Sequence, residues 1–246
     1  DGKFAKDEES ALAGAFEYVI ARRLNGPSRL LGEHMRAQLT APFDDYVNKV
    51  DLYVEDTRSE SSKPVGLSID VTFSRDRATI AGKIRDLKYK LLEGGRLAQL
   101  TYYKPLAEQS SHEPQPIVWL PKVIVGIDRG RALDAIKSLS AAEAAGTEAN
   151  ERDLKTGLMV LYQMSEQIKA YLWYSKTRIS AKEKPQVGAT IARYEEVLAD
   201  IEGVLADLNL DYDKLRAYAQ TSVVTQVIEA QLAAELGYST HQDAQK

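Results

Sequence analysis

Two neighbouring segments with alternating hydrophobicity limit the folds that this chain can adopt. In residues 49–55, and again in residues 67–73, apolar side chains alternate with polar ones at every second position. A period of two is typical of β-strands that bury one face, and the polar residues 56–64 between the segments favour a hairpin loop. We therefore predict two adjacent antiparallel strands whose apolar faces share a core.

Helical spacing of apolar residues is found before and after these strands. The helices predicted in this part are residues 8–24, 28–39, a short one through Tyr46, 76–92 and 131–145. Two further strands are predicted at residues 97–103 and 122–128, the second buried on both faces because its apolar run is continuous. Together these elements predict an α/β unit, residues 1–146, with a mixed sheet flanked by helices.

After Gly146 the sequence shows helical periodicity only. Helices predicted at residues 151–177, 188–208 and 212–236 indicate a helical bundle or hairpin, so we expect a helical module of residues 147–246. Amphipathic helices often bury a stripe against a partner, and we therefore expect this module to bind a protein or to self-associate. The aromatic residues of its first helix favour core packing over stacking on bases; they are Tyr162, Tyr171, Trp173 and Tyr174.

Composition excludes several kinds of site. The chain has 246 residues, no cysteine and three widely separated histidines, His34, His112 and His241. Thiolate zinc sites, iron–sulfur clusters, disulfides and cysteine nucleophiles are therefore excluded, and a multi-histidine metal site is not expected. No apolar run reaches the roughly 18 residues that cross a bilayer, and no signal-peptide pattern opens the chain. We expect a soluble, cytoplasmic protein without a membrane partner.

The net charge of −4 is unevenly distributed along the chain. Residues 75–104 contain eight Lys or Arg against three acidic residues, whereas residues 186–246 contain four against ten. A basic segment of this kind can bind a polyanion such as nucleic acid, although it is also typical of a solvated helix face. The net charge itself argues against a protein that is basic over its whole surface.

Two aspartates on the predicted strands are the main candidates for chemistry. Asp51 and Asp70 each lie opposite the apolar residues of their strand, so strand pairing can bring their carboxylates onto one surface. Carboxylates held this close repel each other unless a cation lies between them, and they are suitable ligands for Mg²⁺ or Mn²⁺. Such a metal could polarise a phosphodiester and activate water. The alternative is that both occupy only the solvent face of a sheet, although Asp is uncommon in strand interiors.

The order of elements resembles that of the PD-(D/E)XK nuclease-like superfamily. Within residues 8–128 a helix is followed by a strand with Asp51, a strand with Ile69-Asp70-Val71-Thr72, a helix and a further strand. The resemblance implies a restriction-endonuclease-like core in which Asp51 is the first acid and Asp70 the second. The sequence departs from the family at Thr72, which occupies the position of the motif lysine.

The missing strand lysine needs a substitute, because that residue positions water and stabilises developing negative charge. Some members of the family carry the lysine on the neighbouring helix, and here Lys83 lies at the edge of the buried stripe of that helix. Lys90 lies one heptad further on the same face. Both are equally well explained as surface lysines whose stems lie beside the core.

A third carboxylate can come from the first helix. Glu9 shares the inward side of Leu12 and Phe16, although it is also explained as a charge favoured near a helix N-terminus. Glu17 is the weaker choice, and Gln99 can add a polar contact. The predicted catalytic residues are Asp51, Asp70 and Lys83, and the predicted metal ligands are Asp51, Asp70, the carbonyl of Val71 and Glu9.

Two classes of function fit these residues. The first is a metal-dependent phosphodiesterase acting on nucleic acid, DNA in particular, which binds through the basic segment 75–104. The second is an inactive protein of the same fold that binds a protein partner through its helical module. The paired aspartates favour the first class, whereas Thr72 and the negative net charge favour the second. No dinucleotide-binding or phosphate-binding glycine motif indicates another class of enzyme.

Overall fold

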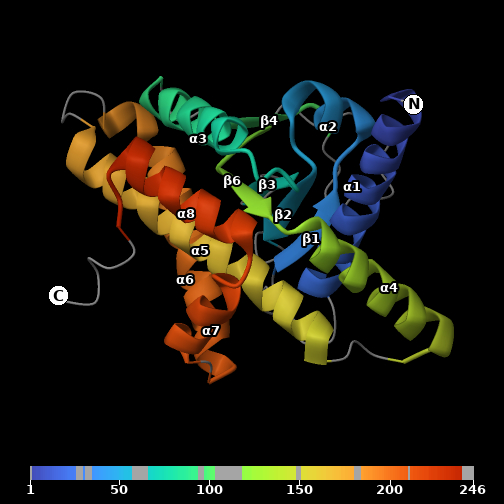
Figure 1. Ribbon diagram of the computed structural model, residues 1–246. Helices are drawn as coiled ribbons and strands as arrows, with labels where there is room; N and C mark the ends of the chain where they lie inside the picture. The colour runs from blue at the N-terminus through green and yellow to red at the C-terminus, as the bar shows by residue number, and fades with distance from the viewer. Residues whose placement is uncertain are drawn as a thin grey trace.

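Helices and strands alternate in a mixed α/β arrangement whose second half is mostly helical (Figure 1). The computed structural model describes residues 2–25, 30, 35–56, 66–93, 97–102, 118–147, 151–179, 184–209 and 211–239. Its elements are α1 (Gly2–Asn25), β1 (Met35–Leu39), α2 (Pro42–Asn48), β2 (Leu52–Asp56), β3 (Gly66–Thr72), α3 (Arg77–Leu92), β4 (Ala98–Leu100), β5 (Val118–Leu120), β6 (Lys122–Gly126), α4 (Arg129–Ala145), α5 (Glu151–Arg178), α6 (Lys184–Asp207), α7 (Tyr212–Ala219) and α8 (Val223–Leu236). None of the described helices is both long and apolar enough to cross a membrane.

A four-stranded mixed sheet, in the order β1-β2-β3-β6, lies between the N-terminal elements and the C-terminal helices (Figure 1). β2 is antiparallel to β1 and β3, and β6 is parallel to β3. Ile69 pairs with Leu52 on one side and with Val123 on the other, and all three are fully buried. The predicted antiparallel pair is therefore confirmed, while most of the loop predicted at residues 56–64 lies outside the described residues.

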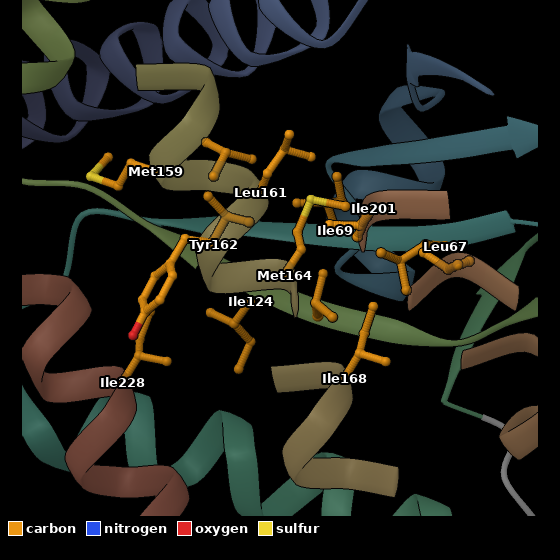
Figure 2. Packing of buried hydrophobic residues seen from close by; sticks show 14 of the residues in the cluster. Leu67, Ile69, Ile124, Met159, Leu161, Tyr162, Met164, Ile168, Ile201 and Ile228 are labelled. Carbon is orange, nitrogen blue, oxygen red and sulfur yellow. The ribbon is translucent and has the colours of Figure 1, made fainter. Parts of the chain in front are cut away.

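One hydrophobic cluster joins the sheet to helices from both halves of the chain. Leu67, Ile69 and Ile124 of the sheet pack with Met164 and Ile168 of α5 (Figure 2), and α1, α3, α6 and α8 add side chains to the same cluster. Each buried aliphatic side chain of this size stabilises the fold by about 1.5–3 kcal/mol. The C-terminal helices thus complete the core of the sheet, and a division into two units near residue 146 stays a prediction.

Side chains of these helices also cover the outer edge of β6. Gln167 of α5 accepts the N–H of Ile124 at 2.9 Å and donates to its carbonyl. Gln163 makes the same pair of hydrogen bonds with the last residue of β6, both at 2.7 Å, and the hydroxyl of Tyr194 on α6 makes a pair with Lys122. Three side chains therefore take the place of a neighbouring strand and satisfy backbone groups that an open edge would leave unpaired.

The predicted helix at residues 28–39 is wrong at its C-terminal end, where the structure contains strand β1. Residues 26–29 and 31–34 lie outside the described residues. In β1, buried Met35 and Ala37 alternate with half-buried Arg36 and Gln38, and the whole segment pairs with β2. The alternation is only five residues long, so the pairing with a strand distant in sequence decides the conformation.

Two further predictions need correction. The helix predicted at residues 212–236 is two helices, because the hydroxyl of Ser222 accepts the N–H of Thr225 and begins α8 as an N-cap. The strand predicted at 97–103 is shortened to β4, which pairs with β5 in a second, two-stranded sheet. Buried residues of that sheet form a separate small cluster with two residues from the β2 region. Its members are Val50, Tyr53, Ala98, Leu100 and Leu120, so Val50 does not join the main core as the alternation predicts.

Candidate active site

Asp51 is held at the bend between α2 and β2. α2 ends at Lys49, whose backbone is left-handed with φ of 54°, and the N–H groups of Lys49 and Val50 donate to the carbonyl of Asp44. The N–H of Asp51 then donates to the carbonyl of Ile69 on β3 at 3.1 Å. A left-handed conformation outside glycine costs about 1–3 kcal/mol. This strained turn places Asp51 just before the strand, not within it as the alternation predicts.

The structure brings Asp51 and Asp70 to the same cavity. Oδ2 of Asp51 accepts the N–H of Val71 at 2.5 Å, which holds the carboxylate against β3 beside Asp70. Asp70 is itself buried in β3. Both aspartates and Val71 line a cavity of about 990 Å³. The two acids that the sequence places on one surface therefore lie around one space large enough for a ligand.

Two lysines form ion pairs with Asp70. Nζ of Lys83, on α3, lies 2.5 Å from Oδ1, and Nζ of Lys122, the first residue of β6, lies 3.1 Å from Oδ2. The side chain of Lys83 is 30% exposed and that of Lys122 only 8%. Lys122 also donates to the carbonyl of Lys49 in the strained turn. Lys83 therefore lies beside Asp70 at the cavity, and it is the more exposed of the two lysines.

Sequence reasoning missed Lys122. Burial lowers the pKa of its ammonium, and the nearby Asp70 opposes that shift. A lysine at the start of a strand buried on both faces is a signal, because such a charge needs a carboxylate partner. Finding the partner requires the strand order, which places β6 beside β3. The spacing of residues along the chain does not contain that information.

Glu17 supplies a carboxylate from the first helix. It lines the cavity, while the side chain of Glu9 lies outside the described residues. Burial raises the pKa of Glu17 to about 7, and the charges of Asp45 and Asp70 add to this shift. The acid that the structure places at the cavity is thus the one that the sequence favours less, and the role of Glu9 stays a prediction.

The carboxylate of Asp51 is also unfavourably placed for a negative charge. Burial raises the pKa of Asp51 to about 7, the charge of Asp70 contributes next, and the hydrogen bond from Val71 opposes the shift. Perturbed acids that share a cleft are typical of functional sites. A cation in the cavity would stabilise the ionised form of these acids.

The remaining candidates have different positions. Lys90 and Gln99 both line the cavity. Thr72 is buried, and its hydroxyl accepts the N–H of Ser74 at 3.2 Å, so it supports the turn after β3 and supplies no positive charge. At this position the strand therefore contributes a structural hydrogen bond and no cation.

Among the described residues, no group of three or more acidic or histidine side chains lies close enough together to hold a metal ion. The chemistry of the donors nevertheless fits Mg²⁺ or Mn²⁺. Mg²⁺ keeps several water ligands and is commonly bound through only one or two carboxylates, and Asp51 and Asp70 provide two. Because Asp70 is engaged by Lys83, an ion would compete with that ammonium for the carboxylate.

Much of the basic segment is paired within the chain. Arg75 lies 3.0 Å from Asp128, Arg85 lies 2.6 Å from Glu235, and Lys90 lies 2.9 Å from an acid one helical turn earlier. Arg96 and Lys104 lie outside the described residues. The positive charge that residues 75–104 carry in the sequence is thus partly neutralised on the surface.

Comparison with known proteins gives no match from which a function could be inferred. No family model, no curated protein and no solved structure matches the chain. A functional assignment therefore depends on the residues around the cavity.

Proposed function

We propose that this protein is a metal-dependent phosphodiesterase that cleaves nucleic acid, DNA in particular, on a restriction-endonuclease-like core similar to that of the PD-(D/E)XK superfamily. The observation that supports this proposal is the convergence of Asp51, Asp70 and Lys83 on one cavity. Asp51 directly precedes β2, Asp70 lies in the paired strand β3, Lys83 lies on the helix that follows, and α1 adds Glu17. This is the set of groups that metal-assisted hydrolysis of a phosphodiester requires.

Each residue has a distinct role in this proposal. Asp51 and Asp70 bind Mg²⁺ or Mn²⁺, and the carbonyl of Val71 together with Glu17 or Glu9 offers further oxygen donors. The cation, when bound, supplies the charge that polarises a phosphodiester and lowers the pKa of water.

In this proposal Lys83 and Lys122 together replace the motif lysine, whose position in the strand is occupied by Thr72. Lys83, which is partly exposed, donates to phosphate oxygens as negative charge develops on them. Lys122, which is buried, stays with Asp70 and holds its carboxylate toward the cavity. Lys83 and Lys90 at the cavity are the members of segment 75–104 that contact the nucleic-acid backbone in this proposal.

A second function is favoured by one specific observation. Asp70 forms ion pairs with two lysines, and Thr72 supplies no cation. An inactive protein of this fold could keep that ion-paired arrangement permanently and bind a protein partner through the helices of residues 147–246. Metal binding separates the two functions, because the inactive protein has no need to exchange Lys83 for a cation.

Cleavage assays with matched variants test the proposal. Linear, nicked and branched DNA and RNA are incubated with the protein in Mg²⁺ and in Mn²⁺, and metal binding is measured by calorimetry. We expect cleavage by the wild type, loss of both cleavage and metal binding in Asp51→Asn and Asp70→Asn, and no change in Asp134→Asn, which removes an exposed acid on α4. Cleavage that survives Asp70→Asn overturns the assignment, and the absence of both activities in the wild type favours the inactive protein.

A further inference from the structure

Exposed aromatic side chains are concentrated on α2 and at the end of β4. Phe43 is 44% exposed, Tyr46 77%, Val47 53% and Tyr102 60%. These four, here called the aromatic platform, make up a large share of the exposed large hydrophobic side chains in the part of the chain that the structure describes. Single exposed apolar residues are ordinary, but a gathered patch marks a binding surface.

The aromatic platform borders the cavity of the candidate active site. Val47 belongs to both, and Asp45, Asn48 and Lys49 of the same segment line the cavity as well. Asp51 follows Lys49 by two residues. A ligand that lies across the platform would therefore reach the cavity that contains Asp51 and Asp70.

A buried carboxylate fixes the arrangement of the rings. Asp44 is completely buried and accepts the N–H groups of Thr101 at 2.8 Å and Tyr102 at 2.9 Å, as well as the amide of Asn48 at 2.6 Å. These bonds tie α2 to the end of β4, and the rings of Phe43 and Tyr102 meet edge to face with centroids 5.3 Å apart. Preorganised rings lose little entropy when a ligand stacks on them.

Lys49 places a positive charge where the platform meets the cavity. Its Nζ lies 4.9 Å from the centroid of the Tyr46 ring, and its exposed side chain also lines the cavity. Exposed rings beside a cation form the combination that binds single-stranded nucleic acid, because bases stack on the rings while the cation contacts the backbone. The exposed rings and the neighbouring ammonium of Lys49 therefore favour this occupant over a protein surface.

We propose that the aromatic platform stacks the unpaired bases of a nucleic-acid strand, and that Lys49 contacts the backbone of that strand at the entrance to the cavity. This inference rests on the proposed function and specifies its substrate class. The substrate is a strand with unpaired bases, such as a single strand, a flap or a branch. In a continuous duplex the faces of the bases are already stacked on each other, so the rings have no access to them.

Binding measured without cleavage tests this inference separately from the proposed function. Fluorescence anisotropy follows a labelled single strand of about 16 nucleotides, the upper end of common single-strand site sizes. The full-length protein is used in chelator, and the Asp70→Asn variant is used in Mg²⁺. DNA and RNA strands and a blunt duplex of equal length form the arms of the test. Binding that persists without any cleavage by the wild type overturns only the nuclease.

We expect Phe43→Ala and Tyr46→Ala each to weaken single-strand binding roughly 5- to 100-fold, the range measured for loss of one stacked base. The matched control is Tyr89→Ala, which removes a tyrosine that is 56% exposed on α3, and it should bind like the parent protein. Tyr46→Trp should retain binding, and quenching of its emission on adding the strand reports stacking directly. A preference for DNA or RNA supports the inference and identifies the sugar.

Three results would overturn the inference. The first is that no strand binds, or that duplex binds as tightly as single strand. The second is equal binding by the parent and by Tyr46→Ala. The third is self-association in sedimentation that Tyr46→Ala abolishes, since the platform would then be an interface between copies of this chain.

Discussion

Polar side chains contact β3 and β6 at two places, the outer edge of β6 and the cavity. The hydrogen bonds at the edge are complete, whereas the charges in the cavity are less well balanced. At the outer edge of β6, Gln163, Gln167 and Tyr194 each both donate and accept a hydrogen bond with the backbone. In the cavity, Asp51 and Asp70 are two negative charges close enough for one to raise the pKa of the other. The first set consists of neutral groups that are fully paired. In the second, Lys83 and Lys122 pair with Asp70, while burial and the charge of Asp70 raise the pKa of Asp51.

This difference is the one expected between side chains that stabilise a fold, as at the edge of β6, and side chains that serve a function, as we propose for the cavity. A satisfied neutral network rigidifies the fold and needs nothing more to be stable. A buried carboxylate whose pKa is raised reduces stability when it ionises, and perturbed acids in a cleft are typical of functional sites. The hydrogen bonds at the covered edge explain why the helices after residue 146 pack on the sheet. The sheet in turn positions the acidic and basic side chains that line the cavity.

The largest expected effect concerns Lys83, the partly exposed lysine that pairs with Asp70. Lys83→Met should lower cleavage by roughly 10²–10³-fold, because it removes one stabilising group from the developing charge. Rates measured at saturating Mg²⁺ test this. The matched control is Lys88→Met, also on α3, whose ammonium donates to the carbonyl of Glu235 away from the cavity. Equal rates for Lys83→Met and the wild type would remove Lys83 from the mechanism.

Breaking the covered edge should cost stability without affecting the cavity chemistry directly. Gln167→Leu leaves both the N–H and the carbonyl of Ile124 without their side-chain partner in the core, at a cost of about 2–4 kcal/mol. Urea unfolding measures this free energy. Gln226→Leu, at an exposed position of α8, should change it by less than about 0.5 kcal/mol. Similar values for both variants would mean that the edge is not held by its side chains.

The close approach of α8 to β6 offers a smaller perturbation at the same edge. A Cβ added at Gly126 would lie 2.2 Å from Cγ1 of the buried Val224, so Gly126→Ala should destabilise the protein by about 1–3 kcal/mol. Gly82→Ala is the control, because no atom lies within 4 Å of a Cβ there and alanine is the better helix former. Thermal melts should therefore shift in opposite directions for the two variants, and a shift in the same direction would contradict the packing.

The two places also differ in how far the sequence predicts them. Alternation along β2 and β3 places Asp51 and Asp70 on one surface, and helical spacing places Lys83 beside it, because these relations depend on neighbours in sequence. Lys122 reaches Asp70 only through the parallel pairing of β6 with β3.

The covered edge could not be predicted at all from local patterns. Gln163 and Gln167 occupy helical positions four residues apart, which is typical of any helix face. Their partners on β6 are 37 and 43 residues away in sequence. The prediction of a helix at residues 35–39 was wrong for the same reason, since the conformation of this segment depends on its pairing with β2.

The smallest expected effect tests the conflict of charges in the metal-free protein. The raised pKa of Asp51 means that the folded state binds a proton more tightly than the unfolded state, whose Asp titrates near about 4. Stability is therefore highest below that value and is lost as the pH rises through about 7. Asn cannot ionise and can still accept the N–H of Val71. Asp51→Asn should thus be more stable than the wild type at pH 8 and equal to it at pH 4.

Chemical unfolding in chelator at several pH values measures this difference, and a second aspartate gives a control of opposite sign. Hydrogen bonds from Thr79 and Ala78 lower the pKa of Asp76, the N-cap of α3, so its ionised form stabilises the fold above its unfolded pKa. Asp76→Asn should therefore gain no stability at pH 8. Saturating Mg²⁺ should stabilise the wild type, by about 2.7 kcal/mol at 100 times Kd, and leave Asp51→Asn unchanged. A variant that gains nothing at pH 8 and responds to Mg²⁺ like the wild type would show that Asp51 is an ordinary polar residue of the turn, and the contrast between the cavity and the covered edge would disappear.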